Sequence, residues 1–205
     1  MKRRTLLGAL GTTGSLGLTG CIGQGPEQHD DTLQRRVSLV AQDAVTAVPH
    51  LQVGVEVLDA EITDAHTARL QITVENTGPP LTVSDPHTAR DCALFNRTEG
   101  KSDPAGLWLH PWPVEYDRTD DRWVRNRSPD EARAFEMYGC NTAVYDTDES
   151  HAQEYAVWDD YRVDGYLEPG TYRFSTPITV GEEGASPAER TTVEWGFSVA
   201  VDDPR

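Results

Sequence analysis

Apolar and polar residues alternate along the first half of the chain, which is typical of strands with one buried face. In the segment 53–62 apolar residues take nearly every second position, with one slip near Leu58. The segment 70–74 alternates again, and residues 64–66 lie between the two as a turn. We therefore expect a hairpin of two half-buried strands. A third, short strand is expected at 81–83.

The C-terminal part repeats this pattern and favours the same class of fold. Strands are expected at 155–161, at 172–174 with 178–180, and at 193–201, where the alternation is the most regular in the chain. The segment 33–48 has apolar residues at both helical and alternating spacings, so both helix and strand remain open there. Short strands with turn residues between them predict a mainly β protein, an antiparallel β-sandwich.

The segment 85–150 does not follow the alternation, and we interpret it as an irregular insertion between strands of the sandwich. Short strands are expected near 107–109 and 123–125. A short helix is expected to begin at Ser128, with Pro129 at its first position and Glu131 completing a capping box. The predicted domain is therefore 33–205, with the insertion at about 85–150.

Two short motifs connect the predicted strands with a known kind of domain. The sequences VENTG at 74–78 and LEPGTYRF at 167–174 resemble Ig-like domains of secreted archaeal and bacterial proteins. The second motif is also similar to the strand pair of BsuPI-type proteinase-inhibitor domains. The resemblance covers about half of the chain and implies a fold more than an activity.

The N-terminus is typical of an export signal. Arg3 and Arg4 form a pair that indicates the twin-arginine route, and an uncharged stretch follows them up to Cys21. The sequence LTGC at 18–21 resembles a lipobox, which implies a lipid on Cys21. We expect a signal peptide at 1–20, a flexible linker at 21–32 and a protein anchored to the outer face of the cell membrane. The alternative is an uncleaved N-terminal anchor, although 16 residues are short for a spanning helix.

The net charge of the chain makes some classes of binding partner unfavourable. The chain has 34 acidic and 18 basic residues, a formal net charge of −16, and its lysines are Lys2 and Lys101. Such a charge disfavours nucleic acids and anionic lipid head groups as partners. This composition and the signal resemble twin-arginine-exported lipoproteins of halophilic archaea, and an acidic surface protein of an ordinary bacterium is the alternative. For a halophilic protein we expect unfolding on dialysis to low salt.

Three cysteines are present, and two remain if Cys21 carries the lipid. An even pair outside the cell suggests a Cys92–Cys140 disulfide, which would stabilise the fold by roughly 4 kcal/mol. Two separate buried thiols are the alternative. The sequons at Asn96 and Asn126 are glycosylation acceptors that would place the insertion at the surface.

No motif predicts catalysis, a metal or a cofactor. The six histidines have no close metal-ligand spacing, and the order of His, Cys and Met does not fit blue copper. The acidic clusters at 117–121, 146–149 and 159–160 do not match an EF-hand loop. There is no Gly-x-Ser-x-Gly and no Gly-rich phosphate loop.

The tryptophans of the insertion are the most suggestive feature. Trp108, Trp112 and Trp123 would stack on sugars or grip a protein if they are exposed, or pack the insertion onto the sandwich if they are buried. The sequence thus favours a non-enzymatic accessory module that binds an envelope protein or a glycan. A protease inhibitor that offers a loop of the insertion is the alternative, followed by an envelope enzyme or a small-ligand binder.

Overall fold

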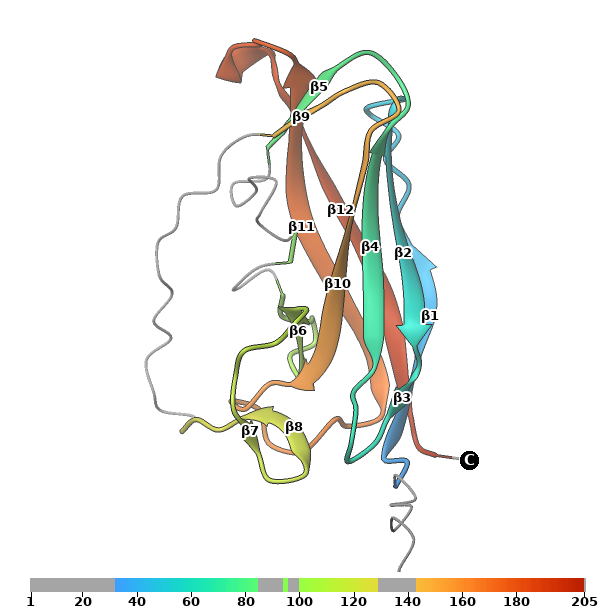
Figure 1. The fold of residues 1–205 in the computed structure, drawn as a ribbon, viewed down its shortest axis with the longest axis vertical. Helices are drawn as coiled ribbons and strands as arrows, with labels where there is room; N and C mark the ends of the chain where they lie inside the picture. The colour runs from blue at the N-terminus through green and yellow to red at the C-terminus, as the bar shows by residue number, and fades with distance from the viewer. Residues whose placement is uncertain (1–31, 85–93, 96–99, 129–142, 205) are drawn as a thin grey trace, which may run out of the picture. The chain divides into compact units, whose positions relative to one another are not determined.

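The computed structural model describes residues 32–84, 94–95, 100–128 and 143–204 of the chain. These residues form two β-sheets that face each other across a common core, which confirms the predicted mainly β sandwich (Figure 1). The predicted helix after Ser128 lies outside the described residues, apart from Ser128 itself. A 3₁₀ turn at Pro187–Glu189 is the one helical element among the residues described.

The first sheet, sheet A, has the strand order β3-β1-β12-β11-β5-β9. All its pairs are antiparallel, and its long central pair joins β11 to β12 from Gly170 to Val180. Its strands are β1 (Arg35–Gln42), β3 (Glu61–Ile62), β5 (Leu81–Ser84), β9 (Ala143–Tyr145), β11 (Gly170–Glu182) and β12 (Thr191–Asp202).

The second sheet, sheet B, is built on the antiparallel ladder β2-β4-β10, with β6 antiparallel to β10 on its other side. A small hairpin, β7–β8, joins this sheet through one parallel pair between Val124 and Asp159. Its strands are β2 (Leu51–Asp59), β4 (Arg69–Asn76), β6 (Leu107–Pro111), β7 (Arg118–Thr119), β8 (Arg122–Arg125) and β10 (Ser150–Asp159).

The alternating segments of the sequence became strands because one face of each is buried. In β4 buried and half-buried residues alternate along the whole strand, and β2 pairs with it as predicted. The slip near Leu58 is a break in the β2–β4 register between Val57 and Asp59. Beyond this bulge the chain changes sheets, so that β3 pairs with β1 rather than with β4.

The ambiguous segment 33–48 contains the strand β1. Only Val37 is fully buried in this strand, while Leu39 and Val40 are exposed. The apolar residues at helical spacing therefore do not mark the buried face of a helix. Pairing with β12, from Arg36 opposite Asp202 to Gln42 opposite Phe197, decides the conformation.

The core between the sheets is centred on five aromatic rings, and the segment predicted to be an insertion supplies one of them. Phe95 has no exposed surface, and its ring lies 5.5 to 6.3 Å from those of Tyr155, Phe174, Trp195 and Phe197. The same segment contributes β6 to sheet B and β9 to sheet A. Parts of 85–150 are thus built into the sandwich.

The VENTG motif forms a polar plug at one end of the sandwich. Asn76 is fully buried, and its side-chain amide donates to the carbonyl oxygens of Pro79, Tyr145 and Asp146 at 2.8 to 3.1 Å. Its side-chain oxygen accepts the N–H of Gly78 at 3.0 Å. A buried amide that is satisfied in this way fixes the connections around β4, β5 and β9.

Candidate functional site

Sheet B is buried on both of its faces near β6, and this places a second group of aromatic rings outside the sandwich core. Leu107 and Leu109 of β6 point into the core, so Trp108 and His110, which alternate with them, point outward. Trp158 of β10 lies opposite Trp108 in the register and shares this outer face. Together with rings from the following segments they form a connected group, which we call the outer aromatic cluster: Trp108, His110, Tyr116, Trp123, Trp158 and Tyr161.

The β7–β8 hairpin covers part of this cluster. The Trp123 ring packs edge-on against Trp158 at 5.7 Å, and its indole N–H donates to the carbonyl of Thr63 at 2.7 Å. The backbone N–H of Trp123 donates to the hydroxyl of Tyr166 at 2.9 Å. Arg118 lies over the Trp123 ring at 4.4 Å and donates to a backbone carbonyl of the turn before β4. Side-chain contacts therefore hold the hairpin in place where its backbone pairing is short.

His110 is the most unusual ionisable group in the cluster. It is 3% exposed, stacks on Trp108 at 5.1 Å and meets the rings of Tyr116 and Trp158 edge-on. Its Nε2 atom is buried without a hydrogen-bond partner. Burial, with a smaller contribution from the Arg125 guanidinium, lowers the pKa of His110 to about 3. The imidazole is consequently neutral at ordinary pH.

A cavity of about 300 Å³ lies beside Tyr116, at the edge of the outer aromatic cluster. The guanidinium of Arg125 lies 3.7 Å from the centre of the Tyr116 ring, and Tyr116 is 48% exposed. Tyr116 thus lines the cavity and also covers His110. The lining residues are Glu115, Tyr116, Asp117, Arg125, Asn126 and Arg127. We call this cavity the tyrosine pocket.

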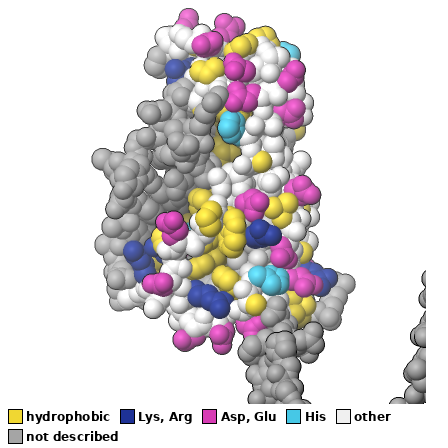
Figure 2. Space-filling view, viewed as in Figure 1, with side chains coloured by type: hydrophobic (Ala, Val, Ile, Leu, Met, Phe, Trp, Pro, Cys, Tyr) yellow, Lys and Arg dark blue, Asp and Glu magenta, His cyan; other side chains and the backbone are white. Residues whose placement is uncertain are grey.

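Trp112 lies on the same outer face, two residues beyond His110. It is 42% exposed, and the guanidinium of Arg69 is 5.5 Å from its ring. Arg69 also forms an ion pair with Glu154 at 3.1 Å, and the backbone N–H of Trp112 donates to the carbonyl of Glu154 at 2.9 Å. In Figure 2 hydrophobic side chains gather in the lower middle of the visible face, with basic and acidic side chains around them.

Asp159 is a second ionisable group with a shifted pKa. Burial raises the pKa of its carboxyl to about 6, while the hydrogen bond from the Leu167 N–H and the charge of Arg122 act in the opposite direction. The N–H···O distance to Leu167 is 2.7 Å. The side chain therefore fixes the turn after β10, at a backbone position where Leu167 has a φ of 45°.

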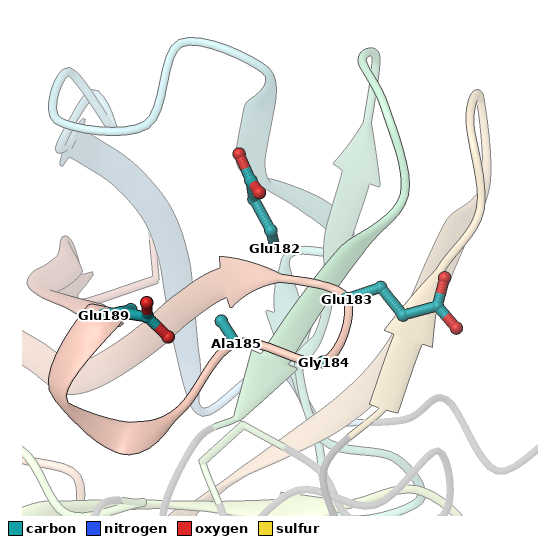
Figure 3. A pocket seen from close by; sticks show the side chains of 5 residues that line it. All are labelled: Glu182, Glu183, Gly184, Ala185 and Glu189. Carbon is teal, nitrogen blue, oxygen red and sulfur yellow. The ribbon is translucent and has the colours of Figure 1, made fainter.

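A second cavity, of about 470 Å³, lies in the loop between β11 and β12. Its lining includes Glu182, Glu183 and Glu189, whose carboxylates point in different directions in Figure 3. Glu189 accepts hydrogen bonds from the backbone and hydroxyl of Ser186, and these bonds lower its pKa. Across the described part of the chain there is no group of three or more His, Cys, Asp or Glu side chains arranged to hold a metal ion.

The predicted tryptophan surface is corrected by the structure. Trp108 is 2% exposed because β6 turns it into the outer aromatic cluster, so it is not part of a partner surface. Trp123 is half-buried under its hairpin, and Trp112 alone of the three is exposed. Three tryptophans that look equivalent in the sequence thus have three different environments.

Other predicted residues lie largely beyond what the structure describes. Asn126 is exposed and lines the tyrosine pocket. The remaining predicted site residues fall outside the described ranges: Arg3, Arg4, Cys21, Cys92, Asn96 and Cys140. Sequence reasoning did not find His110, Tyr116 or Arg125, whose proximity depends on the hairpin folding back over sheet B.

The described residues contain no helix with the length and apolar character that a membrane span requires. No family model, curated protein or solved structure matches the chain. Its function is therefore argued from the geometry above.

Proposed function

We propose that this chain is a non-catalytic binding module that is held at the outer face of the cell membrane and contacts an envelope component. The twin-arginine pair Arg3-Arg4 and the lipobox at Cys21 support the proposed location. The acidic composition supports a halophilic setting, and the pairing of Cys92 with Cys140 belongs to the same proposal.

The observation that carries the binding role is a pair of exposed aromatic side chains on one face of the molecule. Trp112 and Tyr116 are 42% and 48% exposed, and both lie on the outer face of sheet B. Large aromatic side chains that are surrounded by polar groups supply most of the affinity at many protein interfaces. Both exposed residues belong to the segment 112–117 between β6 and β7, which the bond from the Trp112 N–H to the Glu154 carbonyl and the contact of Tyr116 with His110 hold against sheet B.

Arginines beside both rings give this face its polar rim. Arg69 lies against Trp112 and pairs with Glu154, while Arg125 lies against Tyr116. The loop that a protease inhibitor would present, braced by Cys92–Cys140, lies outside the described residues.

Capture from native envelopes tests the proposal. The full-length chain with an affinity tag is incubated in high salt with detergent-solubilised envelope from the source cells, and bound material is identified. Replacing Trp112 or Tyr116 by Ala should abolish capture. Val40→Ala is the matched control, because Val40 is 56% exposed but lies on β1 of the other sheet. Failure of the wild-type chain to capture any envelope component would contradict the proposed function.

A further inference from the structure

Among the residues that the structure describes, the lining of the tyrosine pocket is electrically balanced, although the chain is not. Two carboxylates, Glu115 and Asp117, and two guanidiniums, Arg125 and Arg127, line it. The chain as a whole has almost twice as many acidic as basic residues. A balanced site attracts neither anions nor cations strongly, since their interactions with the two signs cancel. The pocket therefore favours an uncharged ligand.

The polar groups of the pocket suit a ligand with several neighbouring hydroxyl groups. Carboxylates accept two hydrogen bonds side by side, guanidiniums donate two, and the amide of Asn126 does one of each. A hydroxyl group both donates and accepts, so a pair of adjacent hydroxyls can satisfy either kind of planar group. A ligand with few polar atoms would displace water from these groups without replacing its hydrogen bonds, at a cost in affinity.

Tyr116 adds an apolar surface at the edge of these groups. Its ring is nearly half exposed and is held between Arg125 and the edge of His110. A sugar ring has a face of C–H groups and a rim of hydroxyls, which matches an aromatic ring surrounded by planar polar side chains. The volume of about 300 Å³ is at the lower limit of ligand pockets, which suits one or two sugar units.

His110 lies behind Tyr116, outside the lining of the pocket, and is a sign that water or another polar group belongs beneath that ring. Buried polar atoms without a partner are few in folded proteins, and each calls for an explanation such as water or a ligand. The unpartnered Nε2 of His110 lies in a ring whose centre is 5.1 Å from that of Tyr116.

We propose that the tyrosine pocket binds a neutral saccharide, with Tyr116 stacking on the sugar ring and Arg125, Asn126 and Asp117 bonding its hydroxyls. This inference rests on the proposed function, because it names the ligand class for the same outer face. It adds that the envelope component is recognised through its glycan.

Direct titration tests the saccharide site. The full-length chain in detergent and high salt is titrated with methyl glycosides of glucose, galactose, mannose and N-acetylglucosamine, and binding is followed by saturation-transfer NMR. Glucuronic acid is the anionic comparison. At least one neutral glycoside should bind, and Tyr116→Ala should weaken it about tenfold or more through the lost stacking. Tyr116→Phe, which keeps the ring, should stay within about threefold of the wild type.

Further variants test the pocket itself. Asn126→Ala should weaken sugar binding, while Val40→Ala on the other sheet should leave it unchanged. Binding of none of the neutral glycosides, binding of glucuronic acid alone, or an unchanged affinity in Tyr116→Ala would overturn the saccharide site. Circular dichroism of every variant checks that the sandwich is still folded.

Periodate treatment of the envelope separates this inference from the proposed function. Periodate cleaves vicinal diols in glycans and leaves the polypeptide chains of the envelope in place. Capture that is lost after treatment supports the saccharide site. Capture that persists overturns it but leaves the binding module intact. If the wild-type chain captures nothing before treatment and still binds a glycoside, the envelope role fails and the sugar site stands.

Discussion

Replacing His110 by Phe should make the protein less sensitive to acid. In the folded state the pKa of His110 is about 3, against 6.5 for a free side chain, because the imidazole is buried beside Arg125. Below pH 6.5 the unfolded chain therefore binds a proton that the folded chain does not. The contribution of His110 to the free energy of unfolding is therefore complete above pH 6.5. It is lost as the pH falls, by about 1.4 kcal/mol per pH unit down to about pH 3.

The His110→Phe variant would keep the ring contacts with Trp108, Tyr116 and Trp158 but would have no such titration. The variant should be close to the wild type at pH 7 and more stable by about 3 kcal/mol near pH 4. A small gain at pH 7 is also consistent, since an unpartnered buried nitrogen is removed.

Urea unfolding in high salt, followed by tryptophan fluorescence at pH 7, 6, 5 and 4, measures this difference. Asp159 titrates in both proteins, so its contribution cancels in the comparison. Trp112→Phe is the control, because it changes an exposed ring on the same face and should keep the wild-type pH dependence. A difference between wild type and His110→Phe that is the same at pH 7 and pH 4 would refute the assignment of a buried, neutral imidazole.

Four further predictions concern the core, the polar plug, the turn after β10 and the anchor. Phe95→Ala should lower the free energy of unfolding by about 3–5 kcal/mol in urea, with Phe95→Leu losing clearly less. Asn76→Ala should cost about 1–3 kcal/mol in the same assay, because several carbonyls lose their donor, and Thr77→Ala is its exposed neighbour control. Because the pKa of Asp159 is raised to about 6, its own contribution to stability falls as the pH rises from about 4 to 6 and opposes that of His110, so the stability of Asp159→Asn should rise more steeply than that of the wild type over this range. Cys21→Ser should release the protein into the medium, and retention on the membrane would favour an uncleaved anchor.

The sequence predicted most clearly those strands that are buried on one face only, although it also indicated strands near 107–109 and at 155–161. The segments 70–74 and 193–201 alternate because the sandwich core lies on one side and solvent on the other. In β6 and β10 the alternation disappears, because Trp108 and Trp158 are buried on the outer face while Leu109 and Val157 are buried on the inner face. A strand of this kind has no polar side to reveal its register.

The candidate site was harder to predict because no local pattern connects its parts. Tyr116 and Arg125 belong to different segments, and they meet only through the reversal of the chain in the β7–β8 hairpin. His110 shows no metal-ligand spacing, and its burial follows from a register with β10 that sets it opposite Ala156. Phe95 lies in an irregular segment, and its contribution to the core depends on tertiary contacts alone.

The β7–β8 hairpin has little backbone pairing with sheet B, so its local stability should be lower than that of the central strands. β8 meets sheet B at one pair, Val124 with Asp159, whereas β11 and β12 are joined along their whole length. Segments with few backbone bonds open without unfolding the rest of a protein. Amide hydrogens of the hairpin should therefore exchange with solvent well before those of the central strands, and each opening would expose the indoles of Trp123 and Trp158 to water. The fluorescence of this protein would then report two separate events, one at the hairpin and one at the core around Trp195.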